Sequence, residues 1–112
     1  MVSRRRRVIW TEYARDGLDE VLSYIAQDSP VAARKVAEDL IEATSTLSTL
    51  TERGRVVPEL EDPTVRELLV HSYRVIYQVR REDVRILALV HQARDFERHA
   101  RDVRPPDSEP AG

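Results

Sequence analysis

Histidines and arginines are the residues of this 112-residue sequence whose side chains could do chemistry. His91 lies near the end of an apolar stretch, three residues before Arg94. A histidine whose pKa is near 6.5 can carry a proton at neutral pH, and a guanidinium group can stabilise the charge of a phosphate transition state. Cleavage of RNA through its 2′-hydroxyl needs both kinds of group. One candidate set for such a site is Arg66 and Arg74 as phosphate holders, His91 or His99 as acid or base, and Arg94 as the further cation.

Each histidine also has a structural interpretation. His91 comes directly before a Gln-Ala-Arg-Asp segment, where its ring would hydrogen-bond its own loop. His71 precedes Ser72 in a predicted hairpin turn, and His99 lies in a charged C-terminal stretch, so both would be solvated polar residues. The histidines are not spaced as in a metal site, and the chain has no cysteine for a thiolate, a disulfide or a zinc ligand. We therefore expect no metal and no other cofactor.

Arg66 and Arg74 alternate with apolar residues in strand-like stretches. Because successive side chains of a strand point to opposite faces, we expect both arginines on the sheet face that is turned away from the helices. There they could contact a macromolecular target. The structural alternative is an ion pair of Arg66 or Arg85 with Glu67, which contributes only about 0–1 kcal/mol when it is exposed.

Composition limits the class of protein. Hydrophobic residues make up 41% of the chain and charged residues 34%, which is typical of one folded domain and excludes a disordered or fibrous chain. The longest uncharged apolar stretch is far shorter than the roughly 18 residues of a membrane-spanning helix. No apolar signal segment follows the first arginines. The sequence therefore predicts a cytoplasmic protein that has no membrane partner.

Charge is distributed unevenly behind the formal net charge of -2. Residues 1–11 carry four arginines and no acid, residues 12–62 have a net charge of -7, and residues 63–104 have a net charge of +3. A basic surface can attract nucleic acid or an acidic protein even when the whole chain is acidic. We expect the arginines at positions 4–7 to form a solvated arm, with contact to nucleic acid as the alternative.

Periodicity predicts a strand followed by two helices in the first half of the chain. Residues 7–10 are typical of a short strand, and an apolar helical stripe indicates a helix over about residues 12–27. The pair Ser29 and Pro30 is a helix start signal. A second apolar stripe extends from there to Leu50, with Gly54 placed as the residue that ends the helix after Arg53. Residues 12–53 are therefore predicted to form a helical hairpin.

Three strands are predicted in the second half. Residues 56–63 contain two prolines and three acids and are interpreted as a loop. Strand patterns follow over residues 65–71, 73–80 and 84–91, and the short connections force an antiparallel meander. The predicted fold class is α+β: an N-terminal strand, a helical hairpin and a three-stranded antiparallel meander. Residues 1–100 would form the single domain, and residues 101–112 a disordered tail.

Three segments in this order of elements resemble the ParE/RelE superfamily of type II toxin–antitoxin toxins. They are the opening Val-Ile-Trp-Thr-Glu-Tyr-Ala of residues 8–14, the Tyr-Ile-Ala-Gln-Asp-Ser-Pro-Val-Ala-Ala of residues 24–33, and the motifs between Arg66 and Asp95. The resemblance covers about residues 7–96. It implies a small bacterial toxin that forms a hetero-oligomer with a cognate antitoxin, which wraps it. The toxin would meet operator DNA only indirectly, through that antitoxin.

The members of this superfamily divide by target, and the residues here favour the ParE branch. RelE-like toxins cut mRNA on the ribosome, whereas ParE-like toxins act on DNA gyrase without being nucleases. Where RelE-like toxins place lysines, this chain has Glu59, Glu61 and Asp62, and its C-terminal stretch lacks their tyrosine. We therefore expect a gyrase-directed toxin, with an mRNA endoribonuclease as the alternative and a degenerate, non-toxic member as a third possibility.

On this interpretation, the three strands predicted in the second half of the chain bind the target or the antitoxin. An exposed sheet face and free strand edges would bind an acidic antitoxin. Their apolar surface would make the isolated chain unstable or prone to self-association. The residues expected to bind target or antitoxin are Arg66, Arg74, Tyr73, Tyr77, Arg85, His91 and Arg94.

Overall fold

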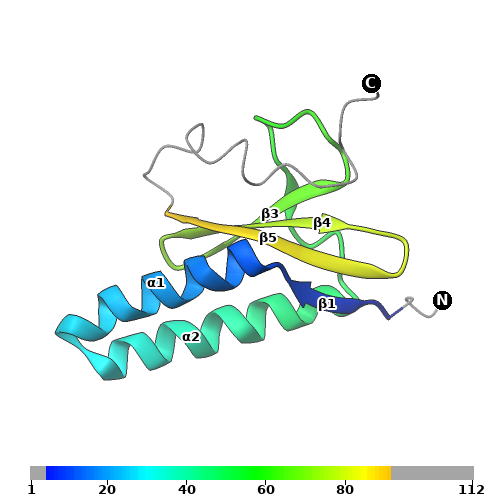
Figure 1. The fold of residues 1–112 in the computed structure, drawn as a ribbon. Helices are drawn as coiled ribbons and strands as arrows, with labels where there is room; N and C mark the ends of the chain where they lie inside the picture. Colours follow the sequence, from blue (N-terminus) through cyan, green and yellow to red (C-terminus); the bar gives the residue numbers. More distant parts are fainter. Residues whose placement is uncertain (1–4, 92–112) are drawn as a thin grey trace.

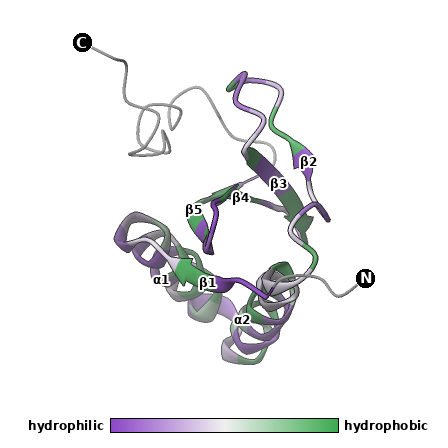
Figure 2. Ribbon diagram, turned by 90° about the vertical axis from the view of Figure 1, so that its right-hand side faces the viewer, coloured by the Kyte–Doolittle hydropathy of each residue, from purple (hydrophilic) through white to green (hydrophobic). Residues whose placement is uncertain are grey.

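Two helices pack against one face of a five-stranded sheet (Figure 1). The computed structural model describes residues 5–91. The helices are α1 (Glu12–Asp28) and α2 (Pro30–Ser45), and the strand order is β1-β5-β4-β3-β2. Figure 2 views the helices end-on and shows both on the same side of the sheet. The strands are β1 (Arg7–Trp10), β2 (Arg55–Val56), β3 (Val65–Val70), β4 (Tyr73–Val79) and β5 (Asp83–His91).

Side-chain caps start both helices where the sequence predicts. Thr11 Oγ1 accepts a hydrogen bond from the Ala14 amide at 3.1 Å, and Ser29 Oγ accepts one from the Ala32 amide at 3.1 Å. Each bond satisfies one of the amides that has no partner inside the helix. No helix in the part of the chain that the structure describes is both long and apolar enough to cross a membrane.

The second helix ends earlier than its apolar stripe predicts. It stops at Ser45 and continues only as a short 3₁₀ turn, η1 (Thr46–Ser48). The hydroxyls of Thr44, Ser45 and Thr46 each donate to a carbonyl three or four residues earlier. Hydroxyls that bond the backbone in this way compete with regular helix geometry. The prediction of a helix reaching Arg53 is therefore wrong, because the pattern of apolar residues ignores this run of hydroxyls.

The sheet contains the predicted antiparallel meander and two further pairings. β1 lies parallel to β5, with Arg7 opposite Asp83 and Trp10 opposite Ile86. β2 pairs with β3 and occupies the start of the segment that the sequence marks as a loop. Two residues are too few to show a strand period, so this edge strand was missed. The α+β class is confirmed, with a mixed sheet of five strands.

Both faces of the sheet are buried, each by a different cover. On the helix side, side chains of α1, α2 and η1 pack on the central strands. On the other side, Val57 and Leu60 of the β2–β3 loop pack on a second cluster that contains Ile76 and Ala88, which are 0% exposed. The expected open sheet face is therefore largely closed over, because the loop brings its own apolar residues to it. The second cluster consists of Val57, Val65, Ile76, Leu87, Ala88 and Val90.

A β-bulge changes which way the end of β5 faces. Ile86 is opposite Tyr77, but Ala88 is opposite Ile76, so Leu87 is an extra residue in β5. An extra residue inverts the alternation of side chains beyond it. Before the bulge Val84 and Ile86 belong to the helix-side core, and after it Leu89 does. The last residue of β5, opposite Tyr73, consequently lies on the helix side as well.

Gly54 is a site of close backbone approach instead of the predicted helix end. Its amide donates to the Tyr77 hydroxyl at 2.9 Å, and that hydroxyl donates to the Thr51 carbonyl at 2.9 Å. A Cβ at position 54 would lie 2.2 Å from the carbonyl oxygen of Glu67 and 2.8 Å from the Tyr77 hydroxyl. Only glycine fits there without moving backbone.

We expect Gly54→Ala to lower the free energy of unfolding by about 1–3 kcal/mol, the usual cost of overpacking. Gly17→Ala is the matched control, because its added Cβ would meet nothing closer than the Leu89 carbonyl oxygen at 3.9 Å. That change should be neutral or stabilise by up to about 1 kcal/mol, since alanine favours a helix. Urea denaturation followed by circular dichroism measures both. Equal stability of the two variants would contradict the close approach.

Candidate functional site

A groove of about 700 Å³ lies between α1 and the ends of β4 and β5. Its floor is apolar, with Leu89 of β5 and Val21 of α1. Gly17 lies where α1 crosses β5 and contributes no side chain, so the groove stays open there. The lining residues are Tyr13, Asp16, Gly17, Glu20, Val21, Tyr24, Ile25, Tyr73, Leu89, Val90 and His91.

Two tyrosines of α1 expose large apolar rings along this groove. Tyr24 is 72% exposed and Tyr13 is 39% exposed. They are eleven residues apart, which is close to three helical turns and places them on one side of the helix. Asp16 and Glu20 lie between them in the sequence and make the rim acidic. Exposed apolar surface with a polar rim is typical of a protein-binding site.

His91 and Tyr73 are two predicted site residues that the structure brings together. Their ring centroids are 5.4 Å apart, and the rings are nearly perpendicular at 88°. This edge-to-face geometry is favourable for aromatic pairs. The β5 bulge makes it possible, because it brings His91 to the same face as Tyr73 at the open end of the groove.

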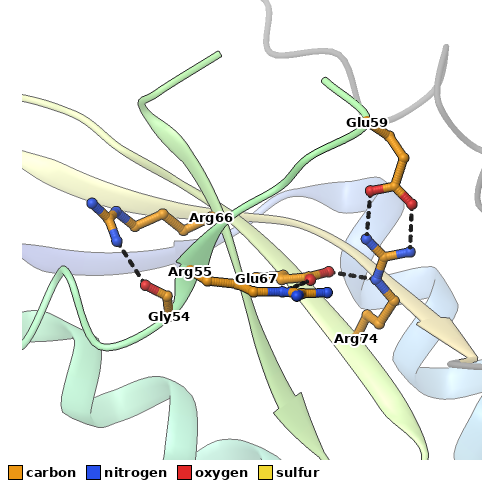
Figure 3. A network of polar contacts seen from close by, with 6 residues as sticks. All are labelled: Gly54, Arg55, Glu59, Arg66, Glu67 and Arg74. Carbon is orange, nitrogen blue, oxygen red and sulfur yellow. Dashed lines mark hydrogen bonds and ion pairs between the residues drawn. The ribbon is translucent and has the colours of Figure 1, made fainter. Parts of the chain in front are cut away.

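Arg74 is buried inside a network of ion pairs (Figure 3). Its Nε donates to Glu67, whose side chain is fully buried, and its two terminal nitrogens lie 3.2 and 3.0 Å from the carboxylate oxygens of Glu59. Arg55 donates to the other oxygen of Glu67. Arg74 does lie on the sheet face away from the helices, as predicted, but its side chain is only 10% exposed. It is engaged by internal carboxylates.

The charges in this network shift each other's titration. Burial by itself would lower the pKa of Arg74, but its hydrogen bonds to Glu59 and Glu67 raise that pKa above the usual value. The same hydrogen bond from Arg74 holds the pKa of Glu59 below its ordinary range. Both groups are therefore charged at neutral pH, and the guanidinium of Arg74 is bonded by two carboxylates, those of Glu59 and Glu67.

Arg66 lies on the opposite face from the one predicted. It is paired in register with Tyr77, whose side chain belongs to the helix-side core, and its guanidinium donates to the Gly54 carbonyl at 2.7 Å. The structural alternative, an ion pair of Arg66 or Arg85 with Glu67, is not formed either, because Glu67 bonds Arg55 and Arg74. Pattern alone did not reveal that β2 brings a further arginine to Glu67.

Tyr77 also differs from its predicted role as a surface contact. Tyr77 is 0% exposed, and burial raises the pKa of its hydroxyl. Its strand alternates as predicted, but that face of the strand is turned into the helical core. Arg85 lies near the other end of β5 from the groove, with its Nε 3.6 Å from Asp83. The other candidates, Arg94 and His99, lie outside the described residues.

Residues 5–91 contain no cluster of three or more acidic or histidine side chains that could hold a metal ion. His71 instead lies in the β3–β4 turn with a positive φ of 55°, and its Nε2 is 2.7 Å from Asp39 Oδ2 on α2. The hydrogen bonds from His71 and Lys35 lower the pKa of the Asp39 carboxyl. This histidine joins the turn to α2 and is more than a solvated turn residue.

Sequence reasoning missed the α1 side of the groove. Tyr13, Asp16, Glu20 and Tyr24 fall outside the apolar stripe that buries α1 against the sheet. A second signal was present in the sequence, because two tyrosines three turns apart on the otherwise polar face of a helix are unusual. Their partner surface on β4 and β5 could not be identified before the bulge was known.

We expect Glu67→Gln to lower the free energy of unfolding by about 3 kcal/mol or more, because it leaves the buried guanidinium of Arg74 without full compensation. Glu59→Gln is the matched control. Its side chain is 39% exposed, so its loss should cost less than about 1 kcal/mol. Chemical denaturation at neutral pH measures both values. If Glu59→Gln proved as costly as Glu67→Gln, the assignment of Glu67 as the central group would be wrong.

Comparison with known proteins agrees with this fold. A family model described as "ParE toxin of type II toxin-antitoxin system, parDE" matches residues 8–96. Toxin RelE2 of Caulobacter vibrioides is 38% identical over 89 residues, which cover 79% of this chain and 97% of that protein. A chain of the solved structure "Chromosomal ParDE TA system from P. aeruginosa" superposes with a TM-score of 0.66 at 25% identity and covers 80% of this chain and 98% of its own length.

These matches confirm the superfamily resemblance that the motifs indicate, and they extend over almost all of the described residues. The chain belongs to the ParE family of toxins of type II toxin–antitoxin systems.

Proposed function

We propose that this toxin inhibits DNA gyrase by binding it, and that a cognate antitoxin neutralises the toxin. The observation that carries the proposal is the engagement of Arg66 and Arg74 by internal acceptors. The candidate ribonuclease set that the sequence offers uses these two cations to hold the phosphate. With both guanidinium groups committed to the fold, binding of a protein target is the activity that the described surface supports best.

The surroundings of His91 also argue against cleavage of RNA at this residue. The groove at whose end it lies is rimmed by Asp16 and Glu20. Carboxylates raise the local negative potential and repel the RNA backbone. The two carboxylates therefore disfavour an RNA phosphate next to His91.

The groove fits a segment of the antitoxin. Its apolar floor and the exposed rings of Tyr13 and Tyr24 would accept apolar side chains, as in helix-in-groove recognition. Its acidic rim favours flanking lysine or arginine residues in the partner. This differs from the sequence expectation of an acidic antitoxin on arginine-rich strands, since the arginines of those strands are largely occupied.

We expect the purified toxin to inhibit supercoiling of relaxed plasmid by gyrase, and expect stoichiometric antitoxin to restore it. A coupled translation reaction run in parallel should leave the mRNA intact. Plasmid topology on agarose gels and primer extension on the transcript measure the two outcomes. Broken transcripts beside unaffected supercoiling would refute the gyrase target, most clearly if His91→Ala abolished the breakage while antitoxin affinity was unchanged.

We expect Tyr24→Ala to weaken antitoxin binding by at least about tenfold, because aromatic anchors at the centre of an interface contribute more than about 1.4 kcal/mol. Val31→Ala is the matched control: Val31 is 79% exposed on α2 and does not line the groove. Its affinity should stay within about twofold of wild type. Isothermal titration with the antitoxin encoded beside the toxin gene measures both, and equal losses would argue against the groove.

A further inference from the structure

Two segments far apart in the sequence place their arginines together at one end of the sheet. Because β1 runs parallel to β5, Arg7 is in register with Asp83 at the start of both strands. Arg6 Nε donates to the Arg80 carbonyl at 2.9 Å and ties the N-terminal segment to the β4–β5 turn. Figure 1 shows the start of β1 and this turn on the same side of the molecule. We call this group the arginine patch: Arg5, Arg6, Arg7, Arg80, Arg81 and Arg85.

The arginine patch is strongly positive although the protein is acidic overall. Its six arginines are interspersed with only two acids, Glu82 and Asp83, so its formal charge is +4. The Asp83 carboxylate is already balanced, since Oδ1 lies 3.3 Å from Arg80 Nε and 3.6 Å from Arg85 Nε. Arg5, Arg7 and Arg81 are exposed to solvent. The positive field is therefore directed outward.

We propose that the arginine patch binds the phosphate backbone of a nucleic acid. Guanidinium groups present planar forks that match phosphate oxygens. A shallow hollow of about 340 Å³ lies between the two segments and is lined by Arg7, Arg80, Arg81, Glu82 and Asp83. A phosphate seated there would meet donors from both segments.

An acidic protein segment is the competing ligand, and the patch fits it less well. Protein interfaces take most of their affinity from apolar and aromatic anchors at their centre. Among the described residues, the large hydrophobic side chains that are exposed all lie outside the two segments of the patch. A surface of charge without such anchors is typical of electrostatic contact with a polyphosphate chain.

The arginine patch is separate from the groove. The groove is at the His91 end of β5 and the patch is at the Asp83 end. Eight residue steps of about 3.3 Å place them about 26 Å apart along the strand. The inference therefore does not rest on the proposed function. It revises the expectation that nucleic acid is met only through the antitoxin, because it gives the toxin a contact of its own.

The test is fluorescence anisotropy of the full-length toxin with labelled probes of about 20 nucleotides, one duplex DNA and one single-stranded RNA, at about 50–200 mM salt. Binding should fall steeply with salt. The variant R7Q/R81Q should lower the salt slope by about 2 and weaken binding about tenfold or more at low salt. The probe that binds more tightly identifies which nucleic acid the patch accepts.

The matched control is R15Q/R34Q, which removes two exposed arginines from α1 and α2 at the same cost in net charge. It should leave the salt slope unchanged. Failure of both probes to bind at about 50 mM salt, or equal losses in the two double variants, would overturn the proposal. The proposal would also be overturned if neither nucleic acid binds while polyglutamate binds tightly and loses that binding in R7Q/R81Q. Circular dichroism of R7Q/R81Q checks that its weaker binding is not caused by loss of the fold. R5Q/R81Q is a second variant of the patch for the same measurements.

Discussion

The carboxylate of Glu67 is the group on which the outer half of the sheet depends. Its side chain is fully buried, and a buried carboxylate must be compensated by charge and hydrogen bonds. Arg55 and Arg74 provide that compensation from the strands on either side. Arg74 in turn holds Glu59 of the β2–β3 loop, which carries the apolar cover of the second core. One buried charge thus links an edge strand, a central strand and a loop.

This compensation has a functional consequence. An arginine that neutralises a buried acid cannot serve a substrate or a partner without a large energetic penalty. Arg74 is engaged by two carboxylates in this way, and one nitrogen of Arg66 is engaged by the Gly54 carbonyl. Two candidate binding surfaces stand out among residues 5–91: an apolar, acid-rimmed groove and a cluster of arginines.

Strand β5 is the element that separates these two surfaces. Its first residues pair with β1 and gather the arginines, while its last residues form the wall of the groove. The bulge at Leu87 lets one strand serve both cores, because it places Leu87 and Ala88 in one and Leu89 in the other. The groove and the cluster of arginines therefore lie at opposite ends of the same strand.

The sequence by itself determined the class of fold, both helix starts and the meander, because caps and periodicity are local signals. It also determined the family through motifs in a fixed order. Only the tertiary structure decided that Gly54 is a contact point, that Tyr77 is buried and that Glu67 takes Arg55 as a partner. These outcomes depend on register, on one bulge and on a two-residue strand. Such features join residues that are distant in the chain, and no local pattern records them.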